Sequence, residues 1–64
     1  MMAKYEDWDK ATKPTPGDVV RLKAGGMLMT VESGTEGEAK CVWFNEDKEL
    51  QRGVFRAAAL QRKK

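Results

Sequence analysis

The chain has 64 residues, which suffices for one domain, and a chain of this length buries only about 60% of the surface that its unfolded form exposes. Twelve Lys and Arg residues nearly balance ten Asp and Glu residues, so the net charge of +2 does not by itself indicate a nucleic-acid partner. With one cysteine and no histidine, the sequence excludes an internal disulfide and a zinc site, which leaves oligomerisation as the source of extra stability.

Residues 1–15 are predicted to be a polar leader outside the core. They show no sustained helical or strand period and end near Pro14 and Pro16, which favour extended backbone. Tyr5 and Trp8 stand three residues apart, as neighbours on one turn of helix do. The leader is therefore predicted either to form one short helical turn or to hold these two side chains against the fold as a hydrophobic clasp.

A first hairpin is predicted directly after the leader. Residues 16–18 are a turn signal, and residues 19–23 then alternate apolar and basic side chains, as a half-buried strand does. Gly25 and Gly26 break this strand and can adopt the positive φ angles that hairpin turns require. Alternation resumes over residues 27–32, which predicts a second strand.

Two further strands are predicted in the second half of the chain. A mobile loop at 33–37 leads to residues 39–44, the most apolar segment, which predicts a central strand covered at least in part on both faces. A polar turn at 45–48 leads to residues 49–55, a fourth strand. Gly53 lies inside that strand, where glycine commonly marks a bulge or a bend.

The C-terminal residues complete the prediction. Residues 57–60 suit a single helical turn, and residues 61–64 either form a short last strand or fray. Short strands at this spacing predict an all-β fold over residues 16–64: a closed or nearly closed barrel of four to five antiparallel strands, with one short helical turn before the last strand. The predicted interior consists of Val20, Leu22, Met29, Val31, Cys41, Trp43, Leu50, Phe55 and Leu60.

Four segments resemble the YodC-like family of small, uncharacterised bacterial and phage proteins. They are GDVVRLKAGG at 17–26, MTV at 29–31, CVWF at 41–44, and GVF at 53–55 with Leu60. Two departures lie at the first turn, where Ala24 replaces the usual serine and Met27 stands where the family often has proline. The resemblance implies an SH3-like barrel and no particular activity, because fold does not confer function.

Catalysis is not expected from this sequence. Without histidine the usual general base near neutral pH is absent, and Cys41 has only Lys40 beside it, on the opposite face of the strand. The carboxylates stand mostly in or beside turns, where solvated charge is the simpler interpretation. Gly25 and Gly26 could cradle a phosphate beside Lys23, but a turn alone explains them better. We therefore expect no enzyme activity, no cofactor and no metal.

Protein binding is the leading hypothesis for function. Met27, Leu28 and Met29 offer an adaptable apolar patch beside the first hairpin, and SH3-like barrels commonly present such surfaces to partners. The module would act as an adaptor or as a stoichiometric inhibitor, including a phage-encoded inhibitor of host machinery or host defence. A homo-oligomer joined through this patch, or through Tyr5 and Trp8, also stays open.

Nucleic-acid binding is the alternative hypothesis. If the fourth strand and the C-terminus border the first strand, Arg21 and Lys23 join Arg52 and Arg56 in one basic rim, to which Arg62, Lys63 and Lys64 would add. The candidate partner-binding residues are Arg21, Lys23, Met27, Arg52, Arg56, Tyr5 and Trp8. A membrane partner is not expected, because no apolar stretch reaches the roughly 20 residues of a membrane span. We expect a cytoplasmic protein, where an unpaired cysteine stays reduced.

Overall fold

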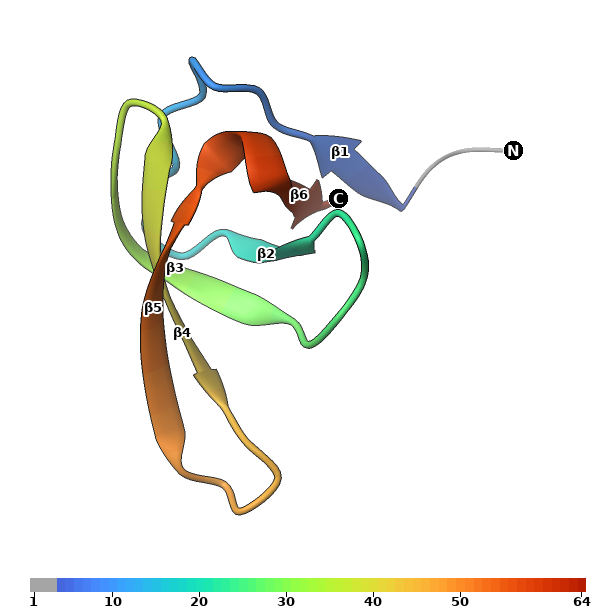
Figure 1. Ribbon diagram of the computed structural model, residues 1–64, viewed down its shortest axis with the longest axis vertical. Coiled ribbons are helices and arrows are strands. Elements are labelled where there is room, and N and C mark those ends of the chain that lie inside the picture. Colours follow the sequence, from blue (N-terminus) through green and yellow to red (C-terminus); the bar gives the residue numbers. More distant parts are fainter. Residues whose placement is uncertain (1–3) are drawn as a thin grey trace.

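The computed structural model describes residues 4–64, which form one antiparallel sheet and one short 3-10 helix (Figure 1). The elements are β1 (Tyr5–Asp7), β2 (Val19–Leu22), β3 (Met29–Thr35), β4 (Glu38–Phe44), β5 (Leu50–Arg56), η1 (Ala57–Ala59) and β6 (Leu60–Lys63). The strand order in the sheet is β1-β6-β2-β3-β4-β5. The predicted all-β class is confirmed, and so is the helical turn before the last strand.

The sheet is open, so the expectation of a closed barrel is wrong. Strands β2 to β5 follow one another as a meander, and β6 returns to pair with β2, with Leu22 opposite Leu60. Both edges of β2 are then occupied, by β3 and β6, and β1 covers the other edge of β6. Within residues 4–64, β5 pairs only with β4, and the β4–β5 hairpin projects away from the other strands (Figure 1).

The leader is part of the sheet and of the core. Tyr5–Asp7 form β1, which pairs with β6, so the predicted helical turn is wrong. The backbone N–H of Trp8 donates to the carbonyl of Leu60 over 3.2 Å, and the Trp8 side chain is only 7% exposed. The clasp hypothesis is correct for Trp8, because its large apolar side chain is buried against the core. The leader at the same time covers the edge of β6 that β2 leaves free. Residues 1–3 of the predicted leader lie outside the described residues.

The remainder of the leader crosses the β3–β4 hairpin. The backbone N–H of Gly37 donates to the carbonyl of Thr12 over 2.9 Å. Pro14 is buried against Gly34, where a Cβ would come within 2.5 Å of the Pro14 carbonyl oxygen. A turn precedes this contact, because the Asp9 carboxylate accepts hydrogen bonds from the Ala11 N–H and the Thr12 hydroxyl, which hold its pKa below the usual value. The leader is therefore fixed at several points.

The turns and irregularities of the sheet differ from those predicted. Gly25 and Gly26 have positive φ angles, as expected, but the loop expected at 33–37 is shorter, because β3 continues to Thr35. The register shift in the sheet lies between Val31 and Ser33. The β4–β5 ladder has a regular register at Gly53, so the strand contains no bulge there.

The core lies on the concave face of the sheet. The buried apolar side chains are Trp8, Val20, Met29, Val31, Ala39, Cys41, Ala57 and Leu60, and the partly buried Leu22, Trp43 and Phe55 pack against them. The prediction that Leu50 belongs to the core is wrong. Leu50 is 50% exposed because it lies opposite Phe44 on the other face, at the far end of the β4–β5 hairpin. Phe44, expected to be covered, is exposed for the same reason.

Candidate functional site

An apolar hollow opens between the β2–β3 connection and the β4–β5 hairpin. It is lined by Leu22, Gly26, Met27, Met29, Trp43 and Phe55. Its volume is about 160 Å³, several times the roughly 30 Å³ that one water molecule occupies in the liquid. The hollow can therefore hold an apolar side chain of a partner.

Two aromatic rings form one wall of the hollow. Trp43 and Phe55 project from neighbouring strands on the same face, with ring centroids 5.9 Å apart and planes tilted by 58°. Gly53 lies opposite Cys41 between them, and a Cβ there would come within 3.1 Å of the Phe55 ring and 3.2 Å of the Trp43 ring. The glycine therefore lets the two rings meet over the strand in a tilted arrangement that aromatic pairs favour.

Flexible apolar side chains form the opposite wall. Met29 is buried at the start of β3, whereas Met27, in the loop after Gly25 and Gly26, is 50% exposed. Leu28 is exposed beside it. Methionine is unbranched and polarisable, so it adapts to apolar partners of different shape. Of the predicted apolar patch of Met27, Leu28 and Met29, the first two side chains are on the surface, whereas Met29 is buried in the core.

The lining side chains determine what this hollow can do chemically. None of the six lining residues carries an ionisable side chain, so the hollow offers no general acid, general base or nucleophile. Cys41 is fully buried beneath the sheet, and burial raises the pKa of its thiol, which keeps it protonated and unreactive. Among residues 4–64, no three His, Cys, Asp or Glu side chains gather as a metal site would require.

The first two basic candidates are engaged by the leader. The Arg21 guanidinium lies 3.8 Å from the centroid of the Tyr5 ring and donates to the Gln61 side chain over 3.2 Å. Lys23 Nζ donates to the Trp8 carbonyl over 2.9 Å. Four of the predicted site residues are therefore brought together, but their contacts fasten β1 and Trp8 to the sheet. Trp8 itself is buried and does not offer a face for stacking on bases.

The other basic candidates lie elsewhere. Arg52 and Arg56 are on β5, which is at the opposite edge of the sheet order from β1 and does not border β2. Arg52 forms an ion pair with Glu32 at 3.2 Å, and Arg62 contacts Glu6 and Asp18, each at 3.5 Å. The arrangement that would have joined Arg21 and Lys23 to Arg52 and Arg56 in one rim is not observed, because β6 occupies that edge of β2.

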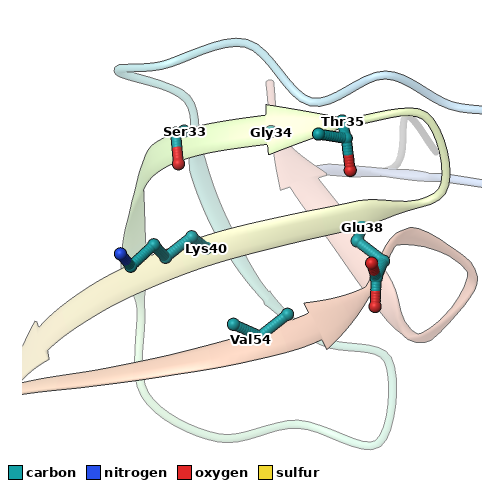
Figure 2. Close-up of a pocket in the computed structure, with 6 residues that line it drawn as sticks. All are labelled: Ser33, Gly34, Thr35, Glu38, Lys40 and Val54. Carbon is teal, nitrogen blue, oxygen red and sulfur yellow. The ribbon is translucent and has the colours of Figure 1, made fainter.

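Two polar hollows lie outside the apolar one. A shallow hollow of about 100 Å³ lies on the convex face and is lined by Ser33, Gly34, Thr35, Glu38, Lys40 and Val54 (Figure 2). A wider one of about 390 Å³ is lined by Lys10, Glu36, Gly37, Glu38, Arg56 and Ala58. Both mix positive and negative side chains, so neither selects one charge of ligand.

The sequence predicted part of this site. Met27 is a candidate from the sequence because it belongs to the apolar patch predicted beside the first hairpin, but Leu22, Trp43 and Phe55 are predicted to lie in the interior. Alternation correctly places Trp43 and Phe55 on the core face of their strands. Their rings also line a surface hollow, because the sheet does not close into a barrel. Whether the sheet closes depends on the pairing of strands that are distant in the sequence, which no local pattern encodes.

A family model described as "Uncharacterized small protein (DUF2158)" matches residues 15–60, which is more than half of the chain. No curated protein and no solved structure matches the sequence. In the part of the chain that the structure describes, no helix is long and apolar enough to cross a membrane.

Proposed function

We propose that this chain, which belongs to the DUF2158 family of uncharacterised small proteins, is a non-enzymatic binding module that docks a protein partner through the apolar hollow. The observation that carries the proposal is a concave apolar surface with two aromatic rings on one wall and an exposed methionine on the other. Aromatic and methionine side chains are enriched where protein interfaces bury their anchors.

The proposal has two forms, an adaptor and a stoichiometric inhibitor of host machinery. The second form suits the phage members of the YodC-like family that the sequence resembles. We place the protein in the cytoplasm, where an unpaired Cys41 stays reduced.

We also propose that the fold is of the SH3-like kind, as the resemblance implies. The meander of β2 to β5, the turn η1 and the return of β6 to the edge of β2 support this assignment. The open gap beside β5 then leaves the hollow accessible to a partner.

The nucleic-acid alternative has weaker support. Arg21, Lys23, Arg52 and Arg62 each contact a group of this chain, so phosphate would compete with contacts that already exist. Of the two aromatic residues proposed for base stacking, Trp8 is buried and Tyr5 is covered on one face by Arg21.

A pull-down from bacterial lysate tests the proposal. The tagged protein is used at low and high salt, with and without nuclease. It is compared with Met27→Gln and with the matched control Phe44→Gln, which changes another exposed apolar side chain on the other face of the sheet. We expect one protein to be retained in stoichiometric amount by the parent and by the control, and to be reduced with Met27→Gln. Recovery of nucleic acid that disappears with salt would instead favour the basic side chains.

A further inference from the structure

We propose that the partner segment binds in extended conformation and adds a strand to the free edge of β5, with carboxylates opposite Arg52 and Arg56. This inference rests on the function proposed above and specifies how the partner reaches the hollow. Strand addition joins the main-chain hydrogen bonds of the edge to side-chain pockets beside it.

The hydrogen-bond pattern shows which backbone groups face the edge. Beyond one end of the β4–β5 ladder the Ala57 N–H donates to the Gly37 carbonyl over 2.8 Å, and beyond the other the Asn45 N–H donates to the Glu49 carbonyl over 3.1 Å. Bonded and non-bonded pairs alternate in an antiparallel ladder, so the odd-numbered residues of β5 bond to β4. The N–H and C=O groups of Arg52 and Val54 therefore point away from β4, to the free edge.

The β5 edge is suited to pairing by its length and shape. It has seven residues, contains no proline, and pairs with β4 without a register shift. Proteins usually guard such an edge by shortening, bulging or covering it. The other edge of the sheet, β1, has three residues and exposed acidic side chains at Glu6 and Asp7, so it offers a much poorer template.

An added strand would bring side chains to the hollow. Side chains alternate between faces, so every second residue of the partner would lie on the same face as Phe55. Phe55 is part of the wall of the hollow, so a partner side chain on this face would lie beside its ring. The partner's inward positions are therefore apolar, and one of them occupies the space between Phe55 and Met27.

The other face of β5 determines the charge of the partner. Arg52, Val54 and Arg56 point to the convex face, and Figure 2 shows Val54 there beside Lys40 and Glu38. Each arginine already has one acidic neighbour, because Glu32 pairs with Arg52 at 3.2 Å and Glu38 lies opposite Arg56 on β4. Since β5 itself carries no acidic residue, carboxylates on the partner strand would share these arginines from the free side and form favourable cross-strand pairs. The partner segment therefore alternates apolar and acidic residues.

The same charges oppose a second copy of this chain as the occupant. In a two-fold antiparallel pairing of β5 with itself centred on residue 52, Arg52 lies opposite its own symmetry copy. Centred on Val54, Arg52 lies opposite Arg56 of the other copy, and centred on Gly53, the two Arg52 side chains are diagonal neighbours. Like charges directly opposite each other destabilise a ladder, so the first two registers are disfavoured, and in the third the two Arg52 side chains still lie close together.

A peptide selection tests this inference. A random library of twelve-residue peptides, displayed on phage, is selected against the full chain, and enriched peptides are synthesised for titration. We expect alternating acidic and apolar residues. We expect Val54→Pro to weaken binding about tenfold, because it removes one outward N–H. Val54→Thr, which keeps that N–H, is the matched control and should bind like the parent. Thermal melting confirms that both variants fold.

Amide hydrogen exchange separates this inference from the proposed function. Bound peptide should slow exchange at the amides of Arg52 and Val54. Peptides that bind the parent and Val54→Pro equally, but lose affinity for Met27→Gln, would overturn strand addition and leave the hollow as the site. Enriched peptides without acidic residues would show that the arginines only guard the edge. A library that yields no binder at all would contradict both proposals.

Discussion

At the scale of single residues, burial separates two leucines that the sequence does not distinguish. Leu60 is completely buried where β6 pairs with β2, whereas Leu50 is half exposed at the end of the β4–β5 hairpin. Leu60→Ala should lower the free energy of unfolding by about 2–5 kcal/mol, through lost apolar burial and a residual cavity. Leu50→Ala should change it by less than about 0.5 kcal/mol. Urea unfolding followed by circular dichroism measures both, and equal losses would contradict the described core.

Cys41 predicts a pH dependence of stability. Burial raises the pKa of its thiol above the ordinary value of 9.0, so the folded state holds the proton more tightly than the unfolded chain does. The stabilisation is complete below pH 9.0 and is lost as the pH rises through that value towards the folded pKa. The free energy of unfolding, measured between pH 7 and 10, should therefore fall more steeply with pH for the parent than for Cys41→Ala. Parallel pH profiles would mean that the thiol ionises as easily in the folded protein.

Single residues also show the limit of sequence-based prediction. Alternation within strands correctly assigned Val20, Val31 and Cys41 to the interior, because a local period of two is enough to define a face. It failed for Trp8 and Leu50. Trp8 does not belong to an alternating segment, and it is buried because β6, which is distant in the sequence, lies beside the leader. Leu50 was assigned to the wrong face of its strand, because the face that points to the core is set by the pairing of β5 with β4.

At the scale of elements, the close approach of the leader to β3 predicts an effect of one methyl group. A Cβ at Gly34 would lie 2.5 Å from the Pro14 carbonyl oxygen and 2.8 Å from its Cβ, so the leader would have to move. Gly34→Ala should destabilise the protein by about 1–3 kcal/mol, as overpacking does. Ser33→Ala, at the exposed neighbouring position, should be nearly neutral. Thermal melts compare the two, and a neutral Gly34→Ala would show that the leader is not held against β3.

The sequence predicted the elements unevenly. The predicted strands at 19–23, 39–44 and 49–55 differ from β2, β4 and β5 by about one residue at their ends, because turn residues bound them. The predicted strand at 27–32 is shifted to Met29–Thr35, because pairing with β4 extends it through the polar residues. The strand β1 was not predicted, since a three-residue segment with two acidic residues becomes a strand only when β6 lies beside it.

At the scale of the whole molecule, the leader contributes a large share of a small stability. A 64-residue domain is expected to have roughly 3–10 kcal/mol of folding stability at 0.05–0.15 kcal/mol per residue. Trp8→Ala should remove about 3–5 kcal/mol of that total, because the ring is buried among core side chains. Phe44→Ala removes an exposed ring and is the control, so its melting temperature should stay close to that of the parent. A variant at Trp8 that melts like the parent would show that the leader is dispensable.

The open sheet is also a property of the whole molecule. Strand spacing predicted a closed or nearly closed barrel, because closure is one way in which small β proteins remove their edges. Whether the last two edges meet depends on strand lengths, twist and the path of η1, none of which a local pattern encodes. As a result, the free edge of β5 and the apolar hollow lie beside each other, and this arrangement is the basis of the proposed function.

The most direct test of this account is the affinity of the retained protein partner for the parent and for Met27→Gln, measured by calorimetry at two salt concentrations. We predict that Met27→Gln weakens binding about tenfold at both salt concentrations, through lost apolar burial. Salt should weaken the parent's binding only modestly, because it screens the exposed pairs between Arg52, Arg56 and the partner's carboxylates. Phe44→Gln should bind like the parent. Unchanged affinity for Met27→Gln, together with a steep loss of binding as salt rises, would contradict the account and move the site to the charged surface.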